Sequence, residues 1–199
     1  MNIPVMTTLF IYFVIKLALE CCLSSTATLT DYYFDWGAQD SGIFLAIVGL
    51  LMFPANLLVA HFSRKYEDRE LIVACLWVLL IGVWGIVDYG RHSYRLIQFI
   101  TFGVCIFISS NALEGPNMSL LSKTIPRSWA KGLFNVGLLA TEAGTLGRAV
   151  GDVFITWCGL ESISHLLNNM FIPLGLLVGV TLAGTYQAFP YLEPFDKDD

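Results

Sequence analysis

The sequence predicts an all-α integral membrane protein folded as one six-helix bundle. Of its 199 residues, 56% are hydrophobic and only 14% are charged, and the mean hydropathy is +0.67. Soluble domains carry about 25% charged residues, so this composition excludes a water-soluble globular domain. Six apolar stretches also have the length of about 17–25 residues that a helix needs to cross a bilayer. The stretches are Val5–Thr28, Ile43–Phe62, Leu71–Val87, Leu96–Leu121, Leu133–Trp157 and Leu166–Phe189.

The connections between the stretches and the positions of basic residues predict how the helices are arranged. Each connection is short, which favours antiparallel neighbours in one compact bundle. Seven Lys and Arg residues fall on the side shared by both termini, against Arg91 and Arg95 on the opposite side. Because basic loop residues are retained in the cytosol, we predict that both termini face it. Residues 1–190 would then form the bundle, and residues 191–199 a short acidic cytosolic tail.

Six ionisable residues stand inside the predicted spans: Lys16, Glu20, Glu114, Glu142, Arg148 and Asp152. A charged residue at the centre of a bilayer costs about 2.5–3.5 kcal/mol. The six together would cost on the order of 15 kcal/mol if they faced lipid without partners. We therefore expect these residues to be paired, hydrated or both.

Helical spacing groups four of these charges into two pairs. Lys16 and Glu20 are four residues apart, so they lie on one helix face within reach of an ion pair. Arg148 and Asp152 repeat that spacing in the fifth stretch. Such pairs either neutralise each other for structural reasons or form part of a functional site, and the spacing leaves both interpretations open.

The two remaining carboxylates favour a role in proton or charge coupling. Glu114 and Glu142 have no basic residue four positions away on their own helices. A carboxyl group in a low-dielectric environment holds a proton more readily than one in water, which suits proton coupling. We assign this role to Glu142 and Glu114, with Glu20 and Asp152 as further candidates.

The fifth stretch, Leu133–Trp157, has two different faces. At about 100° per residue, its polar residues fall within an arc of roughly 140°, and its small residues lie on the opposite side. The polar residues are Asn135, Glu142, Thr145, Arg148 and Asp152, and the small ones are Ala140, Gly144, Gly147 and Gly151. Small residues let a neighbouring helix approach closely, whereas the charged face needs water or partners.

Arg148 is the natural anchor for an anionic substrate. Its guanidinium stays charged, and its planar fork matches the oxygens of phosphate or carboxylate. Lys16, near the middle of its span, offers a second cation. Asn117, which shares a polar stripe with Glu114, and Asn135 complete the predicted substrate-binding set.

Other classes of function are disfavoured by the same sequence. The net charge is −5, and basic residues form no large cluster, so nucleic acid is not an expected partner. The sequence contains none of the common hydrolase, nucleotide-binding or zinc-enzyme motifs. We therefore predict no enzyme activity, no cofactor and no metal site. The expected partners are the lipid bilayer and an inorganic anion.

Several motifs spread over the whole chain carry a resemblance to a known family. They are Tyr12–Lys16 with Glu20, Tyr32–Phe34 with Trp36, Glu67–Arg69, Leu113–Ser122, and Gly137–Thr145 followed by Arg148. In these motifs the chain resembles the carboxyl-terminal half of the SPX–major-facilitator proteins, the vacuolar phosphate transporters of plants and other eukaryotes. The matching motifs contain Lys16, Glu20, Glu114, Glu142 and Arg148.

The resemblance implies a secondary transporter that moves inorganic phosphate or a similar anion across a vacuolar or other intracellular membrane by alternating access. Family members also have an SPX domain and six preceding helices. We therefore expect this chain to act with an amino-terminal six-helix half or as a homodimer. Two alternatives stay open. One is an anion transporter or channel like a lysosomal relative in the superfamily, and the other is a truncated bundle with a structural or dimerising role.

Overall fold

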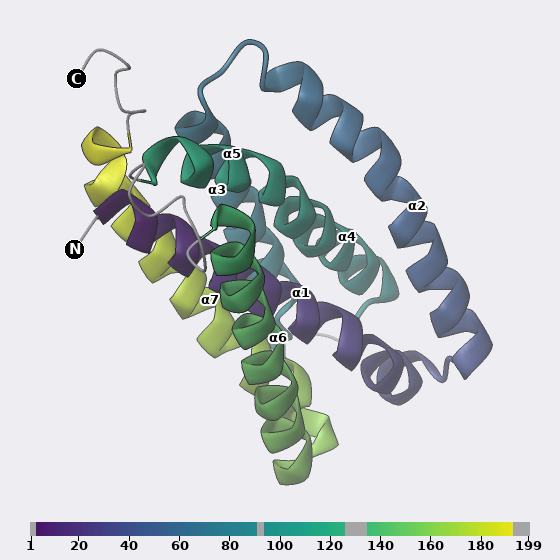
Figure 1. Ribbon diagram of the computed structural model, residues 1–199. Coiled ribbons are helices and arrows are strands. Elements are labelled where there is room, and N and C mark those ends of the chain that lie inside the picture. The colour runs from purple at the N-terminus through teal and green to yellow at the C-terminus, as the bar shows by residue number, and fades with distance from the viewer. Residues whose placement is uncertain (1–2, 91–93, 126–134, 193–199) are drawn as a thin grey trace, which may run out of the picture.

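The computed structural model describes residues 3–90, 94–125 and 135–192, which form a bundle of α-helices (Figure 1). The helices are α1 (Ile3–Phe34), α2 (Ala38–Phe62), α3 (Asp68–Ile86), α4 (Leu96–Ala112), α5 (Glu114–Thr124), α6 (Val136–Glu161) and α7 (Ile163–Ala188). A short 3₁₀ turn, Phe189–Tyr191, follows α7. The predicted all-helical class is confirmed, while the predicted acidic tail lies almost wholly outside the described residues.

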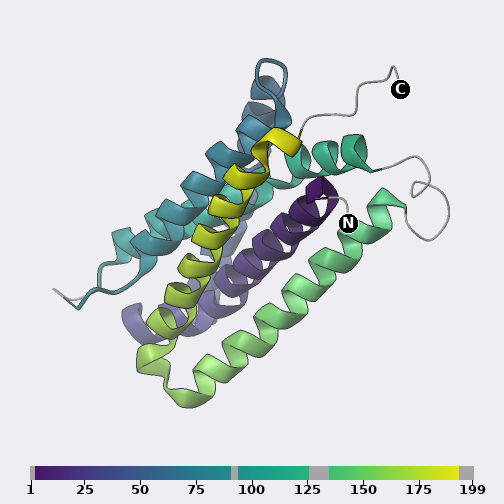
Figure 2. The ribbon, with the colours of Figure 1, turned by 90° about the vertical axis from the view of Figure 1, so that its left-hand side faces the viewer.

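Five segments of the described chain are long and apolar enough to cross a membrane: α1, α2, α3, α4 together with α5, and α7. Helix α6 has 26 residues but is not among the five. Glu142, Arg148 and Asp152 lie along it. Figure 2 shows α6 running beside α1 and α7. The membrane bundle is thus confirmed, whereas the sixth span and the major-facilitator architecture stay predictions.

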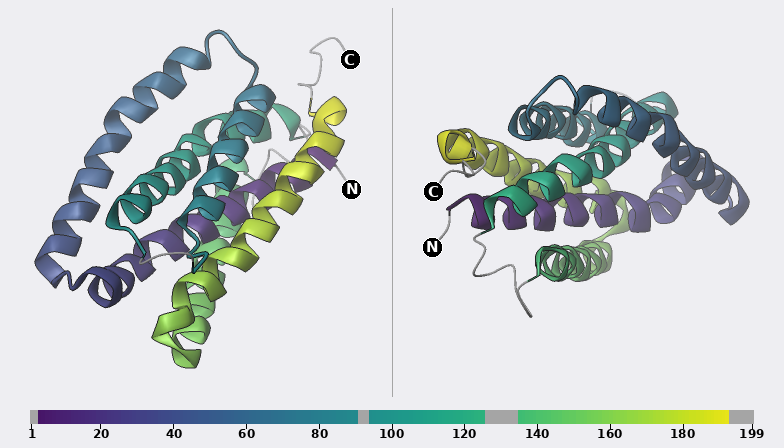
Figure 3. Two further views of the ribbon diagram at one scale, coloured as in Figure 1. Left: turned by 180° about the vertical axis from the view of Figure 1, so that it is seen from behind. Right: turned by 45° about the horizontal axis from the view of Figure 1, so that its top comes forward.

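Helix α1 forms the centre of the bundle and contacts α2, α4, α5, α6 and α7 (Figure 3). In its most apolar window, 61% of the residues are buried inside the chain, against 11% for α2. Helix α3 packs on α4 and α7. One close approach in this layer is at Gly175 of α7, where a Cβ would lie 3.0 Å from the Trp84 ring. The missing side chain of Gly175 therefore lets α7 pack closely on α3.

The predicted span Leu96–Leu121 is divided into two helices. Helix α4 ends at Ala112, and α5 begins at Glu114 after a single intervening residue, Leu113. Pro116 stands in the first turn of α5, where a missing backbone N–H does no harm. This break places Glu114 in the first turn of a helix, where the helix dipole favours a negative charge.

The turn between α2 and α3 lies at the same end of the bundle as the beginning of α1 and the end of α7 (Figure 1). Glu67 and Glu70 form a capping box that starts α3. Beside them, Arg69 donates a hydrogen bond to the Phe189 carbonyl at 3.3 Å and covers the Phe189 ring at 4.6 Å. These contacts fix the end of α7 against α3. The side of the membrane that this end faces stays a prediction.

Candidate functional site

A cavity of about 220 Å³ lies between α1, α5 and α6. It is lined by Tyr12, Lys16, Glu114, Met118, Ala140, Thr141, Gly144, Thr145 and Arg148. Three of the predicted site residues, Lys16, Glu114 and Arg148, therefore meet at one place although they come from three different helices. Two cations and one carboxylate leave this cavity with an excess of positive charge.

Lys16 is the most deeply placed charge of the site, with 9% of its surface exposed. Its ammonium forms an ion pair with the Glu114 carboxylate and lies 5.9 Å from the centre of the Tyr12 ring. A buried charge is costly unless it is paired, and Glu114 supplies the partner. Lys16 is thus held by another helix rather than by its own.

The expected ion pair between Lys16 and Glu20 is not formed. Glu20 instead accepts a hydrogen bond of 2.5 Å from the Ser24 hydroxyl, one turn further along α1. The reason is the position of α5, whose first turn brings Glu114 to the Lys16 ammonium. Glu20 does not line the cavity and packs against Gly151 of α6.

The small face of α6 packs closely on a neighbouring helix, as the sequence predicts, and the structure identifies that helix as α1. Ala140, Gly144, Gly147 and Gly151 are all buried. A Cβ on Gly144 would lie 3.3 Å from Lys16 Cγ, and one on Gly147 would overlap the Phe13 carbonyl oxygen. The absence of side chains on this face lets the backbones of α1 and α6 approach closely.

The charged face of α6 points away from the packed interior. Arg148 lines the cavity and is exposed, and Glu142 and Asp152 on the same helix are exposed outside the cavity. In the part of the chain that the structure describes, none of the three forms an ion pair. The expected pair between Arg148 and Asp152 is therefore absent, and Arg148 keeps its guanidinium available.

The two predicted asparagines lie elsewhere and make structural contacts. Asn117 is fully buried, and its Nδ2 donates to the Thr8 carbonyl at 2.9 Å, which ties α5 to α1. Asn135 is the N-cap of α6, and its Oδ1 accepts the Gly137 N–H at 2.7 Å. Neither residue lines the cavity.

Thr141 is a lining residue that the sequence analysis missed. It stands seven residues before Arg148 on α6, so the two lie two turns apart on nearly the same helix face. The seven-residue spacing from Arg148 could therefore have identified Thr141 from the sequence. In this structure the Thr141 hydroxyl donates a hydrogen bond to the Gly137 carbonyl at 2.7 Å.

These features define a class: a helical membrane protein whose uncovered charged helix face adjoins a positively charged cavity. Comparison with curated proteins identifies its relatives. The chain is 38% identical to an SPX domain-containing membrane protein of Oryza sativa subsp. indica over 91% of its length, or 26% of the relative. Two such proteins of Arabidopsis thaliana are 38% and 36% identical over 83% and 91% of this chain, which is 24% and 26% of their lengths.

The chain thus has homologues among the SPX domain-containing membrane proteins, and the resemblance seen in the motifs is supported to that extent. It spans about a quarter of the length of the curated relatives it matches. No protein-family model matches the chain. No solved structure matches it either.

Proposed function

We propose that this chain forms one half of a secondary transporter that carries inorganic phosphate or a related anion by alternating access across an intracellular membrane, such as the vacuolar one. The observation that carries the proposal is the uncovered charged face of α6, whose Arg148 shares a cavity with the buried Lys16. The relatives supply the membrane setting, the charges of the cavity favour an anion, and the choice of phosphate rests on the resemblance seen in the motifs.

The uncovered face of α6 argues for a second bundle. Three ionisable side chains on one helix would each cost about 2.5–3.5 kcal/mol if they faced lipid at the bilayer centre. Glu142, Arg148 and Asp152 therefore need water or another protein surface. A second six-helix bundle supplies both, because transporters built from two halves place a hydrated site at the interface between them. The second half is either another part of a longer protein or a second copy of this chain.

The cavity has the donors that an oxyanion needs. The Arg148 guanidinium presents a planar pair of N–H donors, and the Lys16 ammonium adds a point charge. The hydroxyls of Thr141 and Thr145 line the same space. An anion bound there would contact α1 and α6 together, which suits a site whose helices move when the bundle rocks.

Glu114 competes with the anion for Lys16. In the present arrangement its carboxylate neutralises the ammonium. Protonation of Glu114 would release Lys16 to the anion, which links a proton to substrate binding. Glu20, Glu142 and Asp152 lie outside the cavity, so a coupling role for them depends on the hydrated seam between the two halves.

The proposal is tested by phosphate binding to the chain in lipid nanodiscs, with sulfate and chloride as competitors. Hydrogen bonds to charged groups contribute about 1.5–3 kcal/mol each, so Arg148→Gln should weaken phosphate binding about 10- to 100-fold. Glu114→Gln should strengthen binding, because it frees Lys16. Arg95→Gln is the matched control, since Arg95 is exposed and does not line the cavity.

Radiolabelled uptake into proteoliposomes then asks whether the chain transports alone. Binding without uptake supports a half that needs a partner bundle. Failure of the unmodified chain to bind any of the three anions contradicts the proposed function. Equal losses from Arg148→Gln and Arg95→Gln would remove Arg148 from the site.

A further inference from the structure

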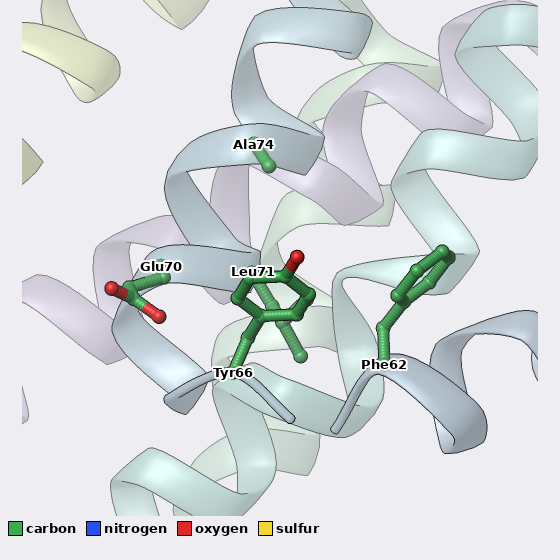
Figure 4. A pocket seen from close by; sticks show the side chains of 5 residues that line it. All are labelled: Phe62, Tyr66, Glu70, Leu71 and Ala74. Carbon is green, nitrogen blue, oxygen red and sulfur yellow. The ribbon is translucent and has the colours of Figure 1, made fainter. Parts of the chain in front are cut away.

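A second cavity, which we name the α2–α3 groove, lies at the end of the bundle where α2 joins α3. It has a volume of about 450 Å³ and is lined by Phe62, Tyr66, Glu70, Leu71 and Ala74. Figure 4 shows the Phe62 and Tyr66 rings on its two sides, with Glu70 directed away from Phe62. Four of its five lining side chains are aromatic or aliphatic, so the groove suits a hydrocarbon chain.

The turn beside this groove carries two uncompensated cations. Backbone hydrogen bonds from Lys65 and Tyr66 to the Phe62 carbonyl, at 2.8 and 3.0 Å, make the turn tight. This places Arg64 and Lys65 between the two aromatic walls in sequence. Both are exposed, and neither forms an ion pair within the described residues.

The nearby acidic residues are already engaged. Asp68 forms an ion pair with Lys123 at 2.5 Å, and Glu67 pairs with Arg69 at 2.6 Å. Glu70 accepts the Glu67 N–H at 3.1 Å within the capping box. Two of the three acids are thus neutralised by other cations, and Glu70 alone does not balance the two charges of Arg64 and Lys65, which leaves positive charge for a partner outside the chain.

A comparable groove at the other end of α2 differs in charge, and we name it the α2–α4 groove. Its volume is about 470 Å³, and its lining includes Trp36, Ile43, Phe44 and Ile47 with Asp40 as its single charged side chain. The two grooves are similar in size and in apolar character. Each groove has one acidic lining residue, Glu70 or Asp40, but only the α2–α3 groove adjoins a turn with two exposed cations, so the two should differ in the lipids they select.

We propose that the α2–α3 groove binds an anionic phospholipid, with an acyl chain between Phe62, Leu71 and Ala74 and the headgroup phosphate at Arg64 and Lys65. Among the five candidate spans of the described residues, α2 is the least covered, with 11% of its apolar window buried, so most of its surface is open to acyl chains. Basic residues at the end of a span attract anionic headgroups. The groove and the turn together match the two parts of one lipid molecule.

The test is native mass spectrometry of the chain released from detergent with phosphatidylserine or phosphatidylcholine of identical acyl chains. The unmodified chain should retain phosphatidylserine preferentially. Each basic residue near a headgroup is worth about fivefold in affinity, so the double variant Arg64→Gln, Lys65→Gln should lose roughly 25-fold. Ala74→Phe, which fills the groove from an exposed position, should lower retention of both lipids.

Ile47→Phe is the matched control, because it adds a similar bulk to the α2–α4 groove and should leave retention of phosphatidylserine unchanged. Thermal unfolding of each variant in detergent verifies that the bundle is intact. Equal retention of the two lipids by the unmodified chain would overturn the proposal. So would full retention by the double variant, or displacement of the lipid by inorganic phosphate, which would make the turn a simple anion site.

Discussion

Helices α2 and α6 are both little covered by the rest of the chain, yet they differ in the charge that their exposed surfaces carry. Helix α2 exposes large apolar side chains along its length, among them Leu50 at 75% and Phe53 at 74%. Helix α6 also exposes apolar side chains, such as Val153 at 67%, but in addition it exposes the three charged residues Glu142, Arg148 and Asp152. Exposure in a membrane protein therefore does not identify the neighbour. The chemistry of the exposed face identifies it. Apolar side chains can face lipid at no cost, whereas the charged side chains of α6 need water or another protein surface.

The two helices also differ in how they are held. Helix α6 packs through glycines whose missing side chains bring its backbone against α1. Helix α2 has three buried residues, Ser41, Val48 and Ala55, which recur every seven positions and so form one narrow stripe. At the first residue of that stripe, the hydroxyls of Ser41 and Thr30 lie 2.8 Å apart and form a hydrogen bond between α2 and α1. A helix held by one stripe leaves most of its surface to lipid.

The largest expected difference between the helices is their accessibility to a water-soluble reagent. Leu50→Cys on α2 should resist a membrane-impermeant maleimide, because this position faces acyl chains. Ala149→Cys, like Leu50→Cys, lies near the middle of its helix, but it is on the exposed polar side of α6 and should react nearly to completion. Labelling is followed by the mass shift of the chain in liposomes.

The unmodified chain supplies the background, since its five cysteines are all buried or half-buried. Equal protection of both introduced cysteines would mean that α6 also faces lipid. The hydrated seam, and with it the proposed anion site, would then be wrong.

The features of α6 that the sequence predicts are local ones. A glycine face and a charged face follow from spacing along a single helix, and both are present. The partner of Lys16 is not local. Glu114 stands 98 residues further along the chain, in the first turn of α5, and it reaches the ammonium through the packing of α5 on α1. Spacing within α1 therefore suggested Glu20 instead.

The two asparagines also show that sequence spacing does not identify the partner of a polar side chain. Asn117 and Asn135 lie near predicted site residues in sequence, but each has a backbone group as its partner. Polarity in an apolar segment indicated that these side chains needed partners. It did not distinguish a ligand from a backbone carbonyl or a helix end, because both satisfy the same donor or acceptor.

The second prediction compares one glycine on each helix. Gly147→Ala should lower the free energy of unfolding by about 3 kcal/mol, because the new Cβ would overlap the Phe13 carbonyl oxygen, a backbone atom with little freedom to move. Gly49→Ala on α2 should raise it by about 0.5–1 kcal/mol, since nothing lies within 4 Å of its Cβ position. Thermal unfolding in detergent measures both. If the two variants unfolded alike, the close packing of α6 on α1 would be refuted.

The smallest expected effect concerns the first turns of the two helices. The N-cap residue of α6 is Asn135, whose side chain caps the helix, whereas the N-cap residue of α2 is Gly37, which has no side-chain cap. Asn135→Ala should cost about 1 kcal/mol of stability and leave phosphate affinity unchanged, because the residue lies outside the cavity. Gly37→Asn should gain a few tenths of a kcal/mol, since its extended backbone already suits a cap. A weaker phosphate affinity of Asn135→Ala at unchanged stability would instead show that Asn135 belongs to the anion site. The substrate contacts of α6 would then extend from its N-cap to Arg148 near its middle.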